Sequence, residues 1–375
     1  MMNIQKVFLL SATVLTVGMV SSPAHGQPSA NVHVIATGLE APRGLRFGPD
    51  GMLYVAEAGT GGTTSTAGLC DQVIAPIGPY KGGKTSRISR IDMSGHRTTV
   101  ASGLPSSVDA IGDLEGVADL TFVDGTLYAL LAGAGCSHGV ADVPNSIVKV
   151  DLQNGSWEVI ANLSEFIQTH MVKYPNPPDF EPDGTFYSMV RHHDRLYAVE
   201  PNHGQVLSIG TDGSIESVLD VSASEGHIVP TAITERDDEF FLGNLNLFPI
   251  QPNYARILTL SHYECNRLAV PGLEDEKAKH SLHILSSKAG FTTIVSTTFG
   301  PDGLLYVLEL SDAAGYPTLG AGKVVRIKCD GNIEDVATGL SVPTAMTFGP
   351  DGKIYASNFG AAPAGAGQIV RIDVP

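Results

Sequence analysis

The sequence predicts an all-β fold, a six-bladed β-propeller with four antiparallel strands in each blade. Three observations predict it: a hairpin motif that recurs along the chain, further strands after each copy, and an N-terminal strand that has no blade of its own. The clearest copies are residues 34–59 and 335–360, which align without a gap and share ATGL and FGPDG. A third FGPDG occupies residues 299–303, and degenerate copies lie at 117–131, 186–200 and 230–244.

Each copy is typical of two short alternating strands joined by a tight turn, in which Asp-Gly supplies the backbone angles that a hairpin needs. A third strand is expected after each hairpin, at 86–92, 146–151, 205–210, 255–261, 323–328 and 368–373. A fourth is expected after the first five of these, at 97–103, 157–163, 215–221, 282–288 and 333–339. Four strands in each repeat of this length indicate a propeller blade.

The last repeat has no fourth strand, because the chain ends at Pro375. Residues 32–38 read as a fourth strand with no blade before it. We therefore expect the N-terminal strand to complete the last blade, which closes the ring and removes free sheet edges. An open solenoid or a β-sandwich is the alternative, and either would leave this divided blade unexplained.

Residues 1–26 have the features of a secretory signal peptide: a Lys-containing start, an apolar run over 7–20, and a small-residue cleavage site ending at Gly26. The run is shorter than the roughly 20 residues of a membrane-spanning helix. An uncleaved anchor is the alternative. We expect residues 27–375 to form a single propeller domain that is secreted or periplasmic, without a membrane span after cleavage.

The charge of the chain limits its partners. Lys and Arg total 23 against 39 Asp and Glu, a net charge of −16. A surface this acidic repels nucleic acid and anionic lipid. Cations and neutral or cationic small molecules remain open as partners, and so do proteins.

The four cysteines of an exported chain fit two disulfides. In the predicted layout, Cys70 and Cys136 lie in equivalent loops of neighbouring blades, and Cys265 and Cys329 follow the third strands of two other neighbours. We therefore predict the pairs Cys70–Cys136 and Cys265–Cys329. Free buried thiols are the alternative.

The longest predicted loops gather at one end of the propeller, which we call the long-loop face: 58–85, 132–145, 164–182, 310–322 and 359–367. The hairpin turns form the opposite turn face. Because a rigid scaffold presents binding loops together, function is expected at the long-loop face.

A polar residue recurs three positions after the aromatic residue of most second strands, at the expected mouth of the channel. Oxygen ligands gathered there would suit Ca²⁺ or Mg²⁺. Bonds to neighbouring backbone amides are the alternative, and no other cofactor is indicated. The predicted ligands are Glu57, Glu200, Asn244, Glu309 and Asn358, with Leu131 as the exception.

Other residues with useful chemistry are scattered. Arg43 and His203 are candidates for substrate binding at the channel, although Arg43 could instead pair with Glu57. His192 and His193 should point to opposite faces of a strand and so cannot share a metal. His138 is expected to lie in a loop. The sequence has no GxSxG, HExxH, CxxC or phosphate-loop motif, so the catalytic residues, if any, are unknown.

Blades one, five and six, with VIATGLEAPRGLRFGPDGMLYVAEAG, YVLELS and the VATGLSVPTAMTFGPDGKIYASNFG ending, resemble the ScyD/ScyE family. These are exported propellers related to NHL-repeat proteins and encoded with scytonemin biosynthesis genes. The resemblance implies a six-bladed propeller, export and a role in secondary-metabolite biosynthesis. It implies no catalytic residue, and the 164–182 and 262–280 stretches depart from the family.

Two functions remain open. The first is binding of a small apolar or aromatic molecule, or of a protein partner, on the long-loop face. The second is an extracytoplasmic enzyme with a hard divalent cation at the channel mouth. Similar six-bladed propellers hydrolyse lactones and esters or condense small molecules, so the second would be an activity of this type.

Overall fold

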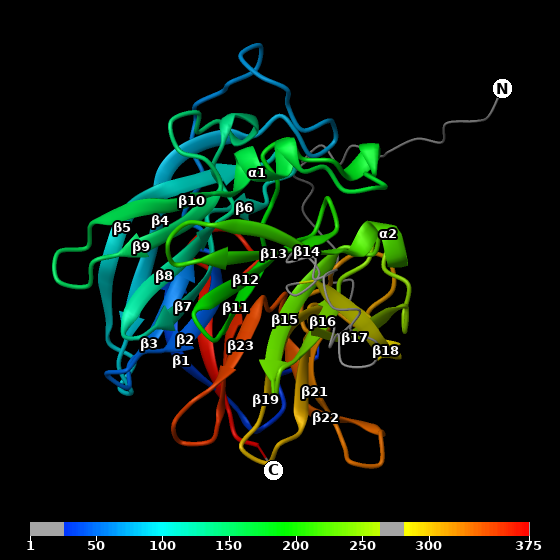
Figure 1. The fold of residues 1–375 in the computed structure, drawn as a ribbon. Coiled ribbons are helices and arrows are strands. Elements are labelled where there is room, and N and C mark those ends of the chain that lie inside the picture. Colours follow the sequence, from blue (N-terminus) through cyan, green and yellow to red (C-terminus); the bar gives the residue numbers. More distant parts are fainter. Residues whose placement is uncertain (1–25, 263–280, 375) are drawn as a thin grey trace, which may run out of the picture.

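The computed structural model describes residues 26–262 and 281–374, and it confirms the six-bladed β-propeller. Six antiparallel sheets surround a central axis (Figure 1). The innermost strands contact one another in a closed cycle that runs from β2 through β7, β11, β15, β19 and β23 and back to β2. Each sheet is therefore one blade, and the ring is closed.

The first three blades follow the chain in order. Blade 1 contains β2 (Pro42–Phe47), β3 (Leu53–Glu57), β4 (Lys81–Ile91), β5 (Arg97–Val108) and β6 (Leu114–Glu115). Blade 2 contains β7 (Val117–Val123), β8 (Thr126–Leu131), β9 (Ser146–Val150) and β10 (Trp157–Asn162). Blade 3 contains β11 (Ser188–His192), β12 (Arg195–Glu200), β13 (Gln205–Gly210) and β14 (Ile215–Asp220).

The other three blades complete the ring. Blade 4 contains β15 (Pro230–Arg236), β16 (Glu239–Asn244), β17 (Ala255–His262) and β18 (Leu282–Phe291). Blade 5 contains β19 (Ile294–Phe299), β20 (Leu305–Glu309), β21 (Gly322–Ile327) and β22 (Ile333–Leu340). Blade 6 contains β23 (Ala345–Phe348), β24 (Ile354–Asn358), β25 (Gly367–Ile372) and the N-terminal β1 (Val32–Leu39).

The predicted closure by the N-terminal strand is confirmed. β1 pairs with β25 in antiparallel register from Val32–Ile372 to Leu39–Gly367. The Asn31 side chain adds two hydrogen bonds of 2.9 Å, to the carbonyl oxygens of Val336 and Asp373. The two ends of the described chain are thus tied into one sheet.

The FGPDG turns show why the motif repeats. In blade 1, the Asp50 carboxylate accepts hydrogen bonds from Met52 N at 3.1 Å and from the Tyr54 hydroxyl at 3.0 Å. Gly51, between them, has φ +75°, a conformation that favours glycine. The same bonds recur with Asp302 and Tyr306 in blade 5 and with Asp351 and Tyr355 in blade 6.

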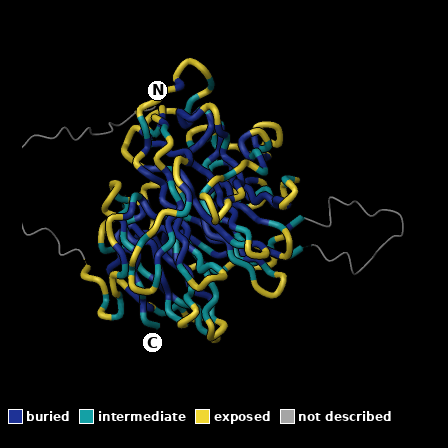
Figure 2. The backbone as a smooth tube through the Cα atoms, turned by 90° about the vertical axis from the view of Figure 1, so that its left-hand side faces the viewer, coloured by how far each residue is buried: buried dark blue, intermediate teal, exposed yellow. Residues whose placement is uncertain are grey.

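The hydrophobic core lies between neighbouring blades. One large cluster joins side chains of blades 1 and 2, among them Ile88, Leu104 and Leu127, and another joins blades 2 and 3. Figure 2 shows the buried segments in the interior and the exposed segments mostly in the peripheral loops. Each blade therefore depends on its neighbours for burial of its apolar faces.

Blade 1 differs from its prediction. Its third strand begins at Lys81 rather than at residue 86, its fourth extends to Val108, and β6 adds a fifth strand. Residues 81–83 pair with residues 106–108. The irregular loop is therefore shorter than the predicted 58–85. The Gly-rich residues 81–83 continue the strand pairing, but their side chains do not alternate between apolar and polar, so the sequence did not predict a strand there.

Helices are few and short in the described chain. They are α1 (Leu163–Thr169), α2 (Val221–Glu225) and the 3₁₀ helices η1 (Cys136–His138) and η2 (Pro177–Asp179). The side chain of Asn162 caps α1 by accepting a hydrogen bond from Glu165 N at 3.1 Å. The loop before β4 and the α1 segment lie together at the upper side of Figure 1.

The Cys70–Cys136 disulfide is confirmed, with a Cα–Cα distance of 6.3 Å. It joins the loops of blades 1 and 2. The second predicted pair involves Cys265, which lies outside the described residues, so it stays a prediction. Cys329 is exposed and makes no disulfide with a described residue.

The predicted signal peptide also falls almost wholly outside the described residues, and export stays a prediction. The disulfide is compatible with an oxidising compartment. In the ranges 26–262 and 281–374, no helix is both long and apolar enough to cross a membrane.

Replacing both cysteines by serine, Cys70→Ser with Cys136→Ser, should lower the free energy of unfolding. The disulfide closes a loop with a sequence separation of 66 residues, for which chain entropy predicts about 4 kcal/mol. Urea unfolding without reductant measures the difference. Thr63→Ser, an exposed change in the same loop, is the matched control and should have no effect. Equal stability of the wild type and the double variant would contradict the prediction.

Candidate functional site

A cavity of about 300 Å³ lies on the propeller axis and extends to the long-loop face. This volume is at the lower end of the range for small-molecule sites, roughly 300–1,000 Å³. Every blade contributes its inner strand or the residues next to that strand. The wall includes Arg43, Ala118, Tyr187, Ala232, Ser296 and Ala345, and the loops add Ile77, Asp179, Leu247 and Phe248.

Three polar residues of the cavity wall gather around a buried histidine. His138 Nε2 donates a hydrogen bond to Glu181 Oε2 at 3.1 Å, and Glu115 Oε2 lies at the same distance from that nitrogen. The Tyr80 hydroxyl lies 3.1 Å from Glu115 Oε1 and 3.2 Å from Glu181 Oε1. Tyr80, Glu115 and Glu181 line the cavity. We call these four residues the acid–histidine cluster.

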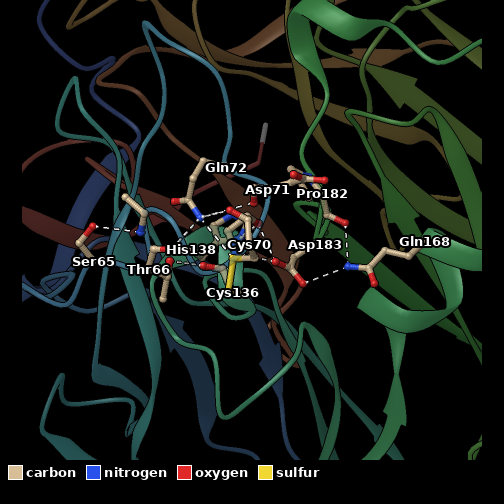
Figure 3. Close-up of a disulfide and its surroundings, with 12 residues drawn as sticks. Ser65, Thr66, Cys70, Asp71, Gln72, Cys136, His138, Gln168, Pro182 and Asp183 are labelled. Carbon is tan, nitrogen blue, oxygen red and sulfur yellow. Dashed lines mark hydrogen bonds between the residues drawn. A yellow bond between two sulfur atoms is a disulfide. The ribbon is translucent and has the colours of Figure 1, made fainter.

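The loop that carries His138 is fixed from both sides. The Cys70–Cys136 disulfide holds the start of η1, and Figure 3 shows it beside His138 and Asp183. Asp183 Oδ2 accepts hydrogen bonds of 2.7 Å from Ser137 N and from Ser137 Oγ. Gly135 must be glycine here, because a Cβ atom would lie 2.3 Å from the Asp183 carboxyl carbon.

Glu181 belongs to the 164–182 insertion between blades 2 and 3, which was expected on the long-loop face, and Asp183 directly follows it. Thr185 Oγ1 donates a hydrogen bond to Glu181 Oε2. The insertion thus brings a second carboxylate against His138, which comes from the neighbouring loop of blade 2. A cluster assembled from four separate segments of the chain has no signature in any one stretch of sequence.

The two carboxyl groups differ in their affinity for protons. Burial, together with the negative charge of Glu181, raises the pKa of Glu115 to about 7, while His138 and Arg43 oppose the shift. Burial also acts to raise the pKa of Glu181, but hydrogen bonds from His138, Thr185 and Tyr80 hold it below its usual value. Glu115 is therefore the carboxyl group that changes protonation near neutral pH.

His138 keeps its proton. Burial acts to lower its pKa, but the contacts with Glu115 and Glu181 outweigh burial and raise the pKa to about 10. Burial, followed by the charges of the two glutamates, raises the pKa of Tyr80 well above its usual value. At neutral pH the cluster therefore contains an imidazolium, an ionised Glu181 and a neutral phenol.

The hydrogen bonds agree with a proton on Glu115. One Tyr80 hydroxyl proton faces two carboxyl groups, so only one of them can accept it. A proton on Glu115 supplies the second hydrogen. Glu115 Oε2 is buried and lies 3.1 Å from His138 Nε2, the nitrogen that also donates to Glu181.

The acid–histidine cluster also has metal-binding spacing, since one ligand atom each of Glu115, His138 and Glu181 lies within 4.8 Å of the others. A metal there would have to displace the His138 proton, because only the neutral imidazole ligates. The raised pKa of His138 opposes that exchange. The arrangement is better suited to holding a proton than to holding a cation.

Arg43 lies on the cavity wall, where its guanidinium donates to the Leu114 carbonyl. It does not pair with Glu57, whose carboxylate is held by Arg87 and Arg97 at 3.2 and 3.4 Å. Arg46, three residues further along β2, lines the same wall. A positive charge thus faces the cavity beside Glu115, and the substrate-binding role of Arg43 stays a prediction.

The five predicted cation ligands share one arrangement: each side chain is buried and bonded to the backbone segment that leads into its own blade. Four of them accept a backbone N–H, and Asn244 donates to a carbonyl. The pairs are Glu57 with Glu40 N, Glu200 with Thr185 N, Glu309 with Thr292 N, Asn358 with Ser341 N, and Asn244 with Ile228 O.

Hydrogen bonds to neighbouring backbone groups are what the alternative to a cation site predicts for these residues. Lys323 Nζ also lies 3.4 Å from Glu309 Oε2, so the protein itself supplies a positive charge at two of the three carboxylates. In the described part of the chain, His, Cys, Asp and Glu side chains gather at metal-binding spacing in two places, neither of which includes these positions. The Ca²⁺ or Mg²⁺ ring stays a prediction without a test.

His203 lies behind the cavity wall rather than on it. Its Nε2 is 2.9 Å from the Glu181 carbonyl oxygen, and its ring stacks on Phe180 with 4.4 Å between centroids. Its backbone N–H donates to Glu200 at 2.5 Å. His203 therefore supports the backbone of Glu181, and its predicted contact with a substrate stays untested.

Sequence reasoning missed the acid–histidine cluster. His138 was expected to be an ordinary loop residue, but it is fully buried in η1. The available signal was its place two residues after Cys136, since a disulfide between loops fixes their neighbours. Tyr80, Glu115 and Glu181 had no comparable signal, because no repeat carries them.

The fold and cavity define the chain as a six-bladed β-propeller with an axial small-molecule-sized cavity. No protein-family model matches it, and no curated protein does either. The ScyD/ScyE assignment therefore stays a resemblance. Solved structures do match, with identities that show the fold alone.

Three of these structures have the same overall fold. A protein assigned as a glucose dehydrogenase from Thermus thermophilus has a TM-score of 0.54 at 16% identity, over 91% of this chain and 99% of its own. A Xanthomonas campestris gluconolactonase has 0.52 at 9%, over 92% and 89%. A PQQ-bound aldose sugar dehydrogenase from Streptomyces coelicolor has 0.51 at 14%, over 94% and 100%.

The cluster should make stability depend on pH. Glu115 and His138 both bind protons more tightly in the folded chain, so the free energy of unfolding should fall as pH rises. The contribution of Glu115 is lost between its unfolded pKa of 4.5 and about 7, on the order of 3 kcal/mol. That of His138 is lost between 6.5 and about 10.

Urea unfolding of the wild type and of Glu115→Gln at pH 5, 7 and 9 measures this dependence. The variant should lose the change between pH 5 and 7, because Gln cannot titrate. Its change above pH 7 should be smaller, because Glu115 is one of the two carboxyl groups that raise the pKa of His138. Glu158→Gln, at an exposed carboxylate, should follow the wild type at every pH. A difference between the wild type and Glu115→Gln that is independent of pH would contradict the assignment.

Proposed function

We propose that this propeller binds a small organic molecule in its axial cavity, at the long-loop face. The observation that carries the proposal is the cavity itself, in which apolar walls from the six blades meet a few convergent polar groups. Such a combination is what small-molecule sites require. The ligand class is a neutral or weakly anionic molecule with an apolar or aromatic part.

The rim and wall favour that class. Leu247 and Phe248 line the cavity although their side chains remain 46% and 44% exposed, and exposed apolar side chains at a concave site often mark ligand contacts. Arg43 offers a positive charge, and Tyr80 and Glu115 offer hydrogen-bonding groups. A role in secondary-metabolite biosynthesis, implied by the ScyD/ScyE resemblance, fits an aromatic ligand.

Anilinonaphthalene sulfonate, an aromatic anion, is a direct probe of this cavity. It should bind the wild type at one site, and Ala345→Phe should weaken binding at least tenfold, because the added ring fills cavity volume. Fluorescence titration measures both dissociation constants. Ala366→Phe adds the same ring at an exposed position and should bind as the wild type does. Unchanged binding by Ala345→Phe, with its melting temperature retained, would reject the cavity as the site.

A second candidate function is acid–base catalysis on the bound molecule, favoured by one observation: Glu115 has a pKa of about 7 on the cavity wall. A general acid or base works best when its pKa is near the working pH. The gluconolactonase shares this fold, and hydrolysis of a lactone or ester needs one such group. The reaction proposed is therefore hydrolysis of a small ester or lactone.

In that reaction, ionised Glu115 removes a proton from a water molecule while the water oxygen attacks the carbonyl carbon. The carbonyl oxygen gains negative charge, which the Arg43 guanidinium stabilises. The bond from the carbonyl carbon to the ester oxygen then breaks, and Glu115 returns its proton to the leaving oxygen. Glu181 and His138 keep Glu115 poised between its two protonation states.

Glucono-1,5-lactone, δ-valerolactone and phenyl acetate are suitable substrates for a test. If one is turned over, Glu115→Gln should lower kcat about 10²–10⁴-fold with retained folding. The kcat/KM of the wild type should rise with pH through about 7 as Glu115 ionises. Glu158→Gln should be fully active. Turnover that Glu115→Gln leaves unchanged would exclude this role but not the binding proposal.

A further inference from the structure

A second histidine-containing cluster lies on the turn face, away from the axial cavity. It comprises His192 and His193 at the β11–β12 turn of blade 3, and Asp238 at the β15–β16 turn of blade 4. One ligand atom from each lies within 4.8 Å of the others. None of the three lines the axial cavity.

The expectation that the two histidines point to opposite faces is wrong. His193 has φ +54° in the turn, so the alternation of a strand ends at His192. The two rings lie side by side, with 4.1 Å between their centroids and an angle of 55° between their planes. The side chains of His192 and His193 can therefore bind one metal ion together.

The distances fit a shared ligand set better than hydrogen bonds. Asp238 Oδ1 lies 3.6 Å from His192 Nε2 and 3.5 Å from His193 Nε2. Hydrogen bonds between nitrogen and oxygen span roughly 2.7–3.2 Å. Ligand atoms around a tetrahedral Zn²⁺, with bonds of about 2.0–2.2 Å, lie about 3.3–3.6 Å apart.

The other nitrogen of His192 faces a carboxylate. Glu235 Oε1 lies 3.4 Å from His192 Nδ1, and the same oxygen accepts a hydrogen bond from Asp238 N at 3.1 Å. Metal-binding histidines commonly direct their second nitrogen at such a group, which orients the ring. Glu235 thereby links the two turns that carry the predicted ligands.

The site is packed against the protein on the side of His192 and open to solvent on the side of His193 and Asp238. The His192 ring is 8% exposed and packs against Phe240, with 5.0 Å between ring centroids. His193 and Asp238 have side chains that are 74% and 76% exposed. The adjacent Arg191 forms an ion pair with Asp124 at 2.9 Å. Asp124 therefore offsets the positive charge of Arg191, which would otherwise repel a cation at the site.

We infer that His192, His193 and Asp238 form a surface site for a divalent transition-metal ion of the Zn²⁺ type. Two imidazoles and one carboxylate are the ligands that such an ion prefers, and a fourth position is left for water. Ca²⁺ and Mg²⁺, which prefer oxygen ligands, should not compete. The site bridges two blades and is independent of the function proposed for the cavity.

The test is titration of the tag-free, metal-stripped chain with Zn²⁺, by calorimetry, and with Co²⁺, by visible absorption. The wild type should bind one equivalent at this site and give the strong absorption of tetrahedral Co²⁺. His193→Asn and Asp238→Asn should each weaken Zn²⁺ binding at least tenfold and lose that absorption. Asparagine tolerates the positive φ at position 193, so His193→Asn keeps the turn.

His33→Asn is the matched control, since it removes a single histidine that faces one carboxylate, Asp373, at 3.3 Å. It should bind Zn²⁺ as the wild type does. Absence of Zn²⁺ binding to the wild type would overturn the inference. Wild-type affinity in both His193→Asn and Asp238→Asn would overturn it equally, because the ion would then lie elsewhere.

Discussion

Closure of the ring by the pairing of β1 with β25 is the constraint on which the rest of the structure depends. A blade buries its apolar faces against two neighbours, so a gap at any position would expose two faces and a sheet edge. The antiparallel register and the Asn31 hydrogen bonds close that gap with strands from opposite ends of the described chain. The inner strands can then form a continuous wall around the axial cavity.

The closed ring also tolerates the acid–histidine cluster, whose charged groups are unfavourable to bury. Burial of two carboxyl groups and an imidazolium removes them from water, and the penalty exceeds what one ion pair returns. Here a proton on Glu115 reduces the number of buried charges, and the Cys70–Cys136 disulfide and the Asp183 bonds hold His138 in place. The propeller supplies the stability that offsets this burial, and residues at the long-loop face keep the pKa of Glu115 near neutral pH.

The blades could be predicted from sequence because their determinants are local and repeated. The Asp50, Asp302 and Asp351 turns each carry their own tyrosine partner a few residues away. The recurrence of Glu57, Glu200 and Glu309 was as visible, and each of these carboxylates accepts a hydrogen bond from a backbone N–H that leads into its own blade. Tyr80, Glu115 and Glu181 occur once each, in the loop before β4, in β6 and in the insertion between blades 2 and 3, and only the three-dimensional fold brings them together. In a repeat protein, recurrence indicates structure, and chemistry is more often found where the repeat is broken.

The two histidine clusters show how burial separates proton binding from metal binding. His138 has no solvent access, and its contacts with Glu115 and Glu181, each at 3.1 Å, stabilise its charged form. A metal ion would have to displace that proton and lose its hydration in a closed space. His193 and Asp238 are open to water, and their 3.5 Å separation is too long for a good hydrogen bond. The same residue types therefore favour a fixed proton beside the cavity and an exchangeable cation on the turn face.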